Sequence, residues 1–139
     1  MNICTFCRII ARDAPAYIID ENESVIAFLS LENHPLVVPR EHVADIYTLD
    51  ENLGAVVMKE TIRIARAVKE GLECEGIFLA QANEPAAGQD VFHFHLHVYP
   101  RWRSKEQNER FAVGQHDSAA KKAIAAAIRQ ALPANAAGE

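Results

Sequence analysis

The stretch VFHFHLHVYP, residues 91–100, decides the fold of this chain. It places histidines at positions 93, 95 and 97, each separated from the next by one apolar residue. Side chains of a β-strand alternate between the two faces of a sheet. The pattern therefore predicts a strand whose apolar side chains face a core. The three imidazoles then share the other face, about 6.6 Å apart at positions i and i+2.

Short apolar runs elsewhere predict the partners of this strand. Four runs, bounded by polar or proline residues, are expected to form strands at 16–20, 24–30, 35–40 and 76–82. Helices and strands mix without a regular alternation that would indicate parallel βαβ units. We therefore expect an α+β fold with an antiparallel sheet of about five strands.

Two further segments predict helices. Apolar residues recur at three- and four-residue spacing from Leu49 to Leu72, which indicates a long amphipathic helix packed on the sheet. Thr48 or Asp50 can cap its start, and Gly71 lies near its end. Residues 118–132 are rich in alanine and predict a C-terminal helix.

Composition and charge limit the classes of function. The chain has 139 residues, half of them apolar, which suits one domain spanning 1–139. The net charge of −5 gives no basic surface for nucleic acid. No run is long enough to cross a bilayer, and no signal peptide is recognisable, so we expect a cytoplasmic protein without a membrane partner. Three cysteines, an odd number, favour a reducing compartment over a disulfide framework.

Three interpretations of the histidine row compete. It is a polar strand face with incidental histidines, a three-histidine metal centre that activates water, or a site of covalent catalysis. In the last case a neutral imidazole attacks an electrophile, which histidine permits because its ordinary pKa of about 6.5 leaves it mostly uncharged near pH 7.

The loop before the row favours covalent catalysis. Gly88 can adopt a positive φ and lets backbone N–H groups approach a ligand, and Gln89 adds a neutral donor. A small-residue loop that leads into a histidine strand is typical of a phosphate cradle beside a nucleophile.

The sequence resembles the histidine-triad (HIT) superfamily in four blocks that occur in the family's order. His93 to Tyr99 match the motif His-φ-His-φ-His-φ-φ, where φ is apolar. CTFCRII resembles the opening C-x-x-C-x-I-I, HPLVVPREHV the H-x-L-V-x-P-K-x-H block, and AQANEPAAGQ the asparagine-bearing loop. The similarity covers a core of about 2–103 and leaves 104–139 as a variable C-terminal extension with a helix.

The resemblance implies an enzyme that cleaves at the α-phosphate of nucleoside phosphoramidates or related nucleotides. His95 would be the nucleophile and would form a covalent nucleotidyl intermediate, with His97 and His34 in its hydrogen-bond network. The expected ligand is a purine mononucleotide or a nucleoside phosphoramidate. It would be bound by Asn83 near the sugar and by Gly88, Gln89 and Val91 at the phosphate.

The resemblance also implies a structural zinc ion. C-x-x-C supplies only two ligands, whereas a closed tetrahedral site uses four. In the zinc-containing branch the other two ligands correspond to His42 and His93, which would join Cys4 and Cys7. The metal would hold the N-terminus against the sheet, and the chemistry at phosphorus would require no cofactor.

Two points lie outside the four blocks. Ser30 stands where the family usually has an acidic residue that binds the ribose. The family's symmetric homodimer is expected here too, with Ile62 and Ala67 of the long helix available to face a second subunit.

Two alternative functions remain open: a dinucleoside polyphosphate hydrolase, and a nucleotide-binding interaction protein with vestigial activity.

Overall fold

The computed structural model describes residues 4–113 and 117–133, so that 1–3, 114–116 and 134–139 of the predicted domain lie outside the described residues. In chain order the elements are α1 (Thr5–Ile10), β1 (Ile18–Glu21), β2 (Val25–Leu29), β3 (Pro35–Pro39), α2 (Glu51–Gly71), β4 (Gly76–Ala80), the 3-10 turn η1 (Pro85–Ala87), β5 (Leu96–Arg101), α3 (Lys105–Val113) and α4 (Ser118–Ala131).

The five strands form one sheet in the order β1-β2-β3-β5-β4, and all four pairings are antiparallel. The predicted α+β fold is therefore confirmed. β5, which carries the end of the histidine row, lies between β3 and β4. Leu36 of β3 is opposite His97, and Phe78 of β4 is opposite Tyr99.

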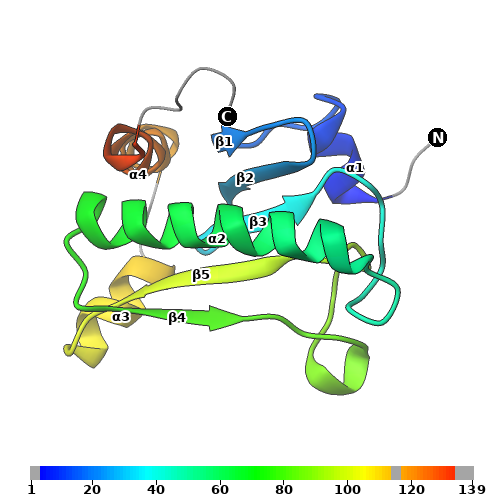
Figure 1. Cartoon of the computed structure of the whole chain (residues 1–139). Helices are drawn as coiled ribbons and strands as arrows, with labels where there is room; N and C mark the ends of the chain where they lie inside the picture. Colours follow the sequence, from blue (N-terminus) through cyan, green and yellow to red (C-terminus); the bar gives the residue numbers. More distant parts are fainter. Residues whose placement is uncertain (1–3, 114–116, 134–139) are drawn as a thin grey trace.

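The long helix α2 covers one face of this sheet (Figure 1). Asp50 caps its start, because its carboxylate accepts hydrogen bonds from the backbone N–H groups of Asn52 and Leu53. The helix ends at Gly71, where a Cβ would lie 2.5 Å from the carbonyl oxygen of Ala127. Glycine at this position therefore allows α4 to approach α2 closely.

The apolar side chains between the histidines face α2, as predicted. Phe94, Leu96 and Val98 are buried in one cluster with α2 and α4 residues. Ala67 is buried in the same cluster, at 1% exposure, so the expectation that it faces a second subunit is wrong. The cause is α4, which covers this part of α2 within the chain, whereas Ile62 remains 45% exposed.

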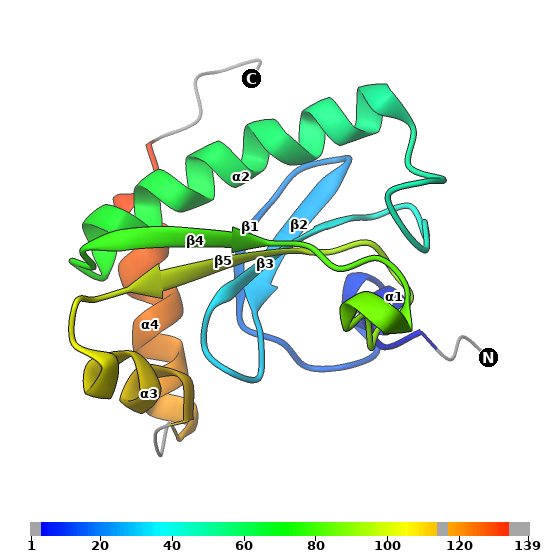
Figure 2. The same cartoon turned by 90° about the horizontal axis from the view of Figure 1, so that it is seen from below.

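The opposite face of the sheet is only partly covered. Figure 2 shows α2 on one side of the sheet and α1 and α3 on the other. Phe6 and Ile9 of α1 pack on Ile26, Phe28 and neighbouring side chains of β2 and β3. The polar members of β5, including His97 and Tyr99, lie on this second face.

Two helices were not predicted, the other strands differ from the predicted bounds by one or two residues at an end, and β5 differs most. α1 has only six residues, too few to show a helical period, and α3 has no buried residue. β5 begins at Leu96 and not at residue 91, because the backbone N–H of Phe94 donates to the carbonyl of Val43 at 2.6 Å. The chain before Leu96 is therefore held by the loop that follows β3.

Among residues 4–113 and 117–133, none of the helices has the length and apolar character needed to cross a membrane.

Candidate active site and metal centre

The ring of His95 is held in one orientation by its own backbone neighbour. Its Nδ1 lies 2.8 Å from the carbonyl oxygen of His93. Because a carbonyl can only accept, Nδ1 carries a proton, and the lone pair of a neutral His95 ring lies on Nε2. The side chain is 6% exposed, and the edge of Phe6 packs against it at 5.0 Å between ring centroids.

His97 is linked to His34, as the resemblance implied. His34 Nε2 and His97 Nδ1 are 2.8 Å apart, and His34 Nδ1 lies 3.0 Å from the hydroxyl oxygen of Ser30. Burial lowers the pKa of His34 to about 3, with further lowering by His97 and Arg101. Burial also lowers the pKa of His97 to about 4. Both rings are therefore uncharged near pH 7.

An aromatic row continues from His97 along the same face of β5. The ring of Tyr99 is nearly parallel to that of His97, with centroids 5.3 Å apart, and lies 4.0 Å from the ring of His34. Phe78 of β4 stacks on Tyr99 at 5.6 Å. The guanidinium of Arg101 lies 4.7 Å from the centroid of the Tyr99 ring. The row thus places an aromatic surface and a cation beside the histidines.

The loop before the histidines is shaped by Gly88 and Gln89. Gly88 ends the turn η1 with a φ of 97°, a conformation that favours glycine. The Gln89 amide accepts from the backbone N–H of Glu84 and donates to the carbonyls of Ala44 and Val91. Gln89 therefore ties this loop to the segment after β3, and both of its amide hydrogens have protein partners.

The two other residues assigned to ligand binding border the same loop. Asn83 accepts from the backbone N–H of Ile46 and exchanges two hydrogen bonds of 2.8 Å with the amide of Gln81. Val91 is half-buried and packs against the apolar cluster that contains Phe6 and Ile9 of α1. The structure thus places Asn83, Gln89 and Val91 in one connected segment, while their contacts to a nucleotide stay a prediction.

Cys4, Cys7, His42 and His93 converge, although they come from three separate parts of the sequence. Their ligand atoms all lie within 4.8 Å of one another. The Sγ atoms of Cys4 and Cys7 are each 3.5 Å from His93 Nδ1, and the Nδ1 atoms of His42 and His93 are 3.2 Å apart. A zinc tetrahedron with bonds of about 2.0–2.3 Å has edges of about 3.3–3.8 Å, so the donor set fits such an ion.

The tautomer of His93 also suits a metal ligand. Its Nε2 donates to the carbonyl oxygen of Pro39 at 2.7 Å, so Nδ1, which faces the thiols, lacks a proton. A ligating histidine commonly donates its second nitrogen to a carbonyl in this way, and the contact fixes the ring. Burial lowers the pKa of His93, which favours the uncharged ring that a metal requires.

Sequence reasoning missed three residues that contact the histidines. Ser30 bonds His34, Phe6 contacts the rings of both His93 and His95, and Tyr99 stacks on His97. The only signal for Tyr99 was its i+2 spacing from His97. The sequence marks Ser30 only as a departure from the family pattern.

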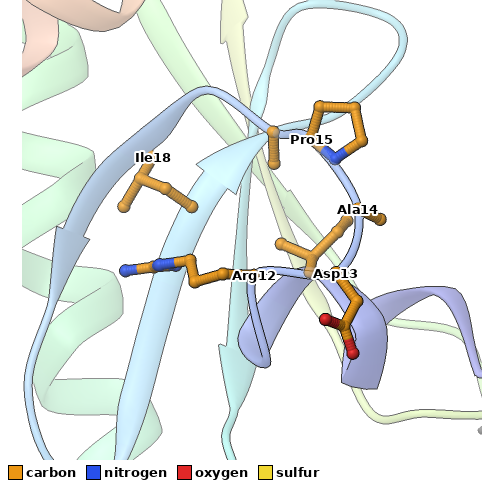
Figure 3. Close-up of a pocket in the computed structure, with 7 residues that line it drawn as sticks. Arg12, Asp13, Ala14, Pro15 and Ile18 are labelled. Carbon is orange, nitrogen blue, oxygen red and sulfur yellow. The ribbon is translucent and has the colours of Figure 1, made fainter.

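A hollow of about 390 Å³ lies at the junction of α1 and β1 (Figure 3). Its lining residues are Ile9, Arg12, Asp13, Ala14, Pro15, Ala16 and Ile18. None of them was predicted as a site residue, and Arg12 forms an ion pair with Glu21. We therefore assign the hollow no role.

Comparison with known proteins gives one consistent match. The sequence profile described as HIT domain matches residues 11–104. "Protein hit" of Bacillus subtilis is 37% identical over 103 residues, which cover 71% of each chain. A Hit-like protein from Bartonella henselae, solved with an unknown ligand, superposes with a TM-score of 0.84 at 29% identity, covering 95% of this chain and 98% of that one. A zinc-bound histidine triad family protein from Mycobacterium smegmatis gives 0.80 at 33% identity, with 93% and 92% covered.

Proposed function

The chain belongs to the HIT domain family, and from this premise we propose that it is a nucleotide-binding hydrolase or transferase. We infer further that it cleaves nucleoside phosphoramidates at the α-phosphate through a covalent intermediate on His95. One observation carries this proposal: His95 Nδ1 is engaged by the His93 carbonyl at 2.8 Å, which leaves Nε2 as the nitrogen for attack, and the ring lies beside that of His97, with centroids 4.9 Å apart.

In the first step, the lone pair on His95 Nε2 forms a bond to phosphorus while the bond from phosphorus to the leaving nitrogen breaks. That nitrogen keeps the electron pair and takes up a proton. In the second step, water attacks the nucleotidyl-histidine, and the nucleoside monophosphate leaves. Splitting one hydrolysis into two displacements makes each step easier.

Donors around the loop are proposed to hold the α-phosphate. The N–H groups of Gly88 and Gln89 donate to the carbonyls of Pro85 and Glu84 and so fix the loop. The N–H groups that follow, as far as Val91, are the ones proposed to bind phosphate oxygens. Fixed donors stabilise charge that develops on these oxygens during transfer. Gln89 keeps this backbone in place through its own hydrogen bonds, and Asn83 is proposed to lie near the sugar.

The cluster of Cys4, Cys7, His42 and His93 is proposed to hold a structural zinc ion. The match to a zinc-bound family member and the convergence of four donor atoms within 4.8 Å of one another support this. Zinc at this position would fix His93, whose carbonyl oxygen in turn accepts the hydrogen bond from His95. The ion's role would therefore be to maintain the orientation of the nucleophile.

A homodimer is the proposed assembly. β4 is an edge strand of the sheet, and its Leu79 is 43% exposed. Met58 and Ile62 of α2 are also exposed, at 44% and 45%. An edge strand with unpaired backbone groups and nearby apolar side chains is suited to pairing with a second copy. Light scattering during size-exclusion chromatography is expected to give twice the monomer mass, and a monomer at micromolar concentration would contradict this.

A specific observation also favours a second candidate, dinucleoside polyphosphates. Phe78 is 51% exposed and stacks on Tyr99, and Arg101 lies over both rings. This aromatic surface could stack the second base, and the guanidinium could attract the additional phosphates. Phe78→Ala should then raise KM for a dinucleoside polyphosphate and leave KM for a phosphoramidate nearly unchanged.

The decisive test is capture of the intermediate. Wild type mixed with an adenosine phosphoramidate and quenched in base should gain the mass of one nucleotidyl group, located on the His95 peptide. Turnover should persist in the presence of a chelator during short assays, because no metal takes part at phosphorus. Label on another residue, or no turnover with either substrate class, would overturn the proposal.

A further inference from the structure

Ser30 is brought to His34 by a short turn between β2 and β3. The backbone N–H of Ser30 donates to the carbonyl of His34 at 2.7 Å, and that of Asn33 donates to the carbonyl of Ser30 at 3.1 Å. Asn33 has a φ of 77°, which allows the chain to reverse within four residues. The turn places the Ser30 hydroxyl oxygen 3.0 Å from His34 Nδ1.

The hydrogen bonds that the Ser30 hydroxyl accepts determine the direction of the hydrogen bond between Ser30 Oγ and His34 Nδ1. Its oxygen accepts from the backbone N–H of Glu32 at 3.2 Å and from that of His34 at 3.3 Å. A hydroxyl has two acceptor lone pairs and one proton, so both lone pairs are occupied. The proton of Ser30 is therefore the one that lies between Oγ and His34 Nδ1.

The same donor-to-acceptor direction continues from His34 to His97. His34 Nδ1 accepts, so the proton of this uncharged ring is on Nε2, which donates to His97 Nδ1 at 2.8 Å. The proton of His97 is then on its own Nε2. His95 has the opposite arrangement, with its proton on Nδ1. Neighbouring rings therefore carry a lone pair on His95 Nε2 and a proton on His97 Nε2.

We propose that Ser30 is a positioning residue that sets the tautomers of His34 and His97, so that His97 Nε2 donates the proton to the leaving group. This inference rests on the proposed function and adds the residue that determines where the protons of His34 and His97 lie. The serine that replaces the family's usual acidic residue thus has a defined task in this chain.

The proton transfers balance. As the bond between phosphorus and nitrogen breaks, the nitrogen keeps the electron pair and takes the proton from His97 Nε2. The His34 Nε2 proton moves to His97 Nδ1, and the Ser30 proton moves to His34 Nδ1. Ser30, which is half-exposed, takes a proton from solvent. Each group gives one proton and receives one, so no charge remains on the buried rings.

The tautomers can be measured without turnover. Long-range ¹H–¹⁵N spectra of ¹⁵N-histidine protein should show His97 as the Nε2–H tautomer in wild type and in Ser30→Thr, which keeps the hydroxyl. Ser30→Ala should show a mixture of both tautomers. His97 as the Nδ1–H form in wild type, or identical spectra in Ser30→Ala, would overturn the inference, whatever the substrate.

The kinetic test compares two leaving groups. An adenosine phosphoramidate of an alkylamine requires a proton on departure, whereas the 4-nitrophenyl ester of AMP does not. We expect Ser30→Ala to lower kcat about 10–100-fold for the amine, and less than about threefold for the nitrophenolate. Ser30→Thr should restore the amine rate.

Equal losses on both substrates would indicate a merely structural role and would refute the assignment, as would full activity of Ser30→Ala on the amine. Activity on the nitrophenyl ester shows that the variant is folded. Failure of wild type on both substrates would instead refute the proposed function, and the spectra would still report on Ser30.

Discussion

The two ends of the histidine row differ in what holds them, although they share residue type and spacing. At one end, His93 donates from Nε2 to the Pro39 carbonyl and directs Nδ1 at two thiols and a second imidazole. At the other end, His97 directs Nδ1 at His34, which bonds Ser30. Between them, His95 bonds only the backbone through Nδ1.

In each of these histidines, the hydrogen-bond partner of one ring nitrogen decides the task of the other nitrogen. A carbonyl on Nε2 leaves Nδ1 available as a metal ligand, and a carbonyl on Nδ1 leaves Nε2 available as a nucleophile. An imidazole that donates to Nδ1 leaves Nε2 protonated. Three identical residues are thereby suited to three different tasks.

Replacing the middle histidine should give the largest effect. His95→Ala removes the attacking lone pair, so we expect kcat to fall by about 10⁴-fold or more. Nucleotide binding, measured by calorimetry, and metal content, measured by mass spectrometry, should remain. A fully active His95→Ala protein would contradict the distinction between the middle of the row and its ends.

Loss of a metal ligand at the His93 end of the row should mainly lower the free energy of unfolding. Cys7→Ala removes a sulfur ligand next to both His42 and His93, and we expect loss of the proposed zinc ion. The free energy of unfolding should fall by about 4 kcal/mol where free metal exceeds Kd about 1,000-fold. Denaturant titration with and without chelator checks this. Cys74→Ala, which alters the buried cysteine outside the cluster, should keep the zinc.

At the His97 end of the row, burial of His34 should make the protein less stable as the pH falls. Because the folded pKa of His34, about 3, lies below its ordinary 6.5, the unfolded chain binds the proton first as pH falls. This contribution to stability is complete above pH 6.5 and is lost toward pH 3. Wild type should therefore lose about 2–3 kcal/mol more than His34→Gln between pH 7 and pH 4.5. Equal losses in denaturant titrations would show that His34 is not buried uncharged.

The smallest effect is expected at Phe6 of α1, which packs against two members of the row. Phe6 contacts the rings of His93 and His95, so Phe6→Leu should cost about 1 kcal/mol and loosen both. Zinc affinity and kcat/KM should each fall less than about tenfold. Phe28→Leu is the matched control, because Phe28 contacts Phe6, and it should cost similar stability without a change in either.

Much of the fold could be predicted because the relevant signals are local. The period of α2, its Asp50 cap and the apolar runs of the strands depend on neighbours within a few residues. The short helix α1 could not be predicted, because six residues are too few to show a helical period. The late start of β5 could not be predicted, because the contact between Phe94 and Val43 joins residues far apart in the sequence.

The sequence by itself determined that the apolar side chains between the imidazoles face the core, because apolar and polar residues alternate with the period of a strand. It also supplied the residues of the proposed zinc site through resemblance. Only the tertiary structure decided which nitrogen of each ring is engaged. Pro39, His34 and Ser30 reach the histidines through folding, and hydrogen-bond direction depends on partners that lie distant along the chain.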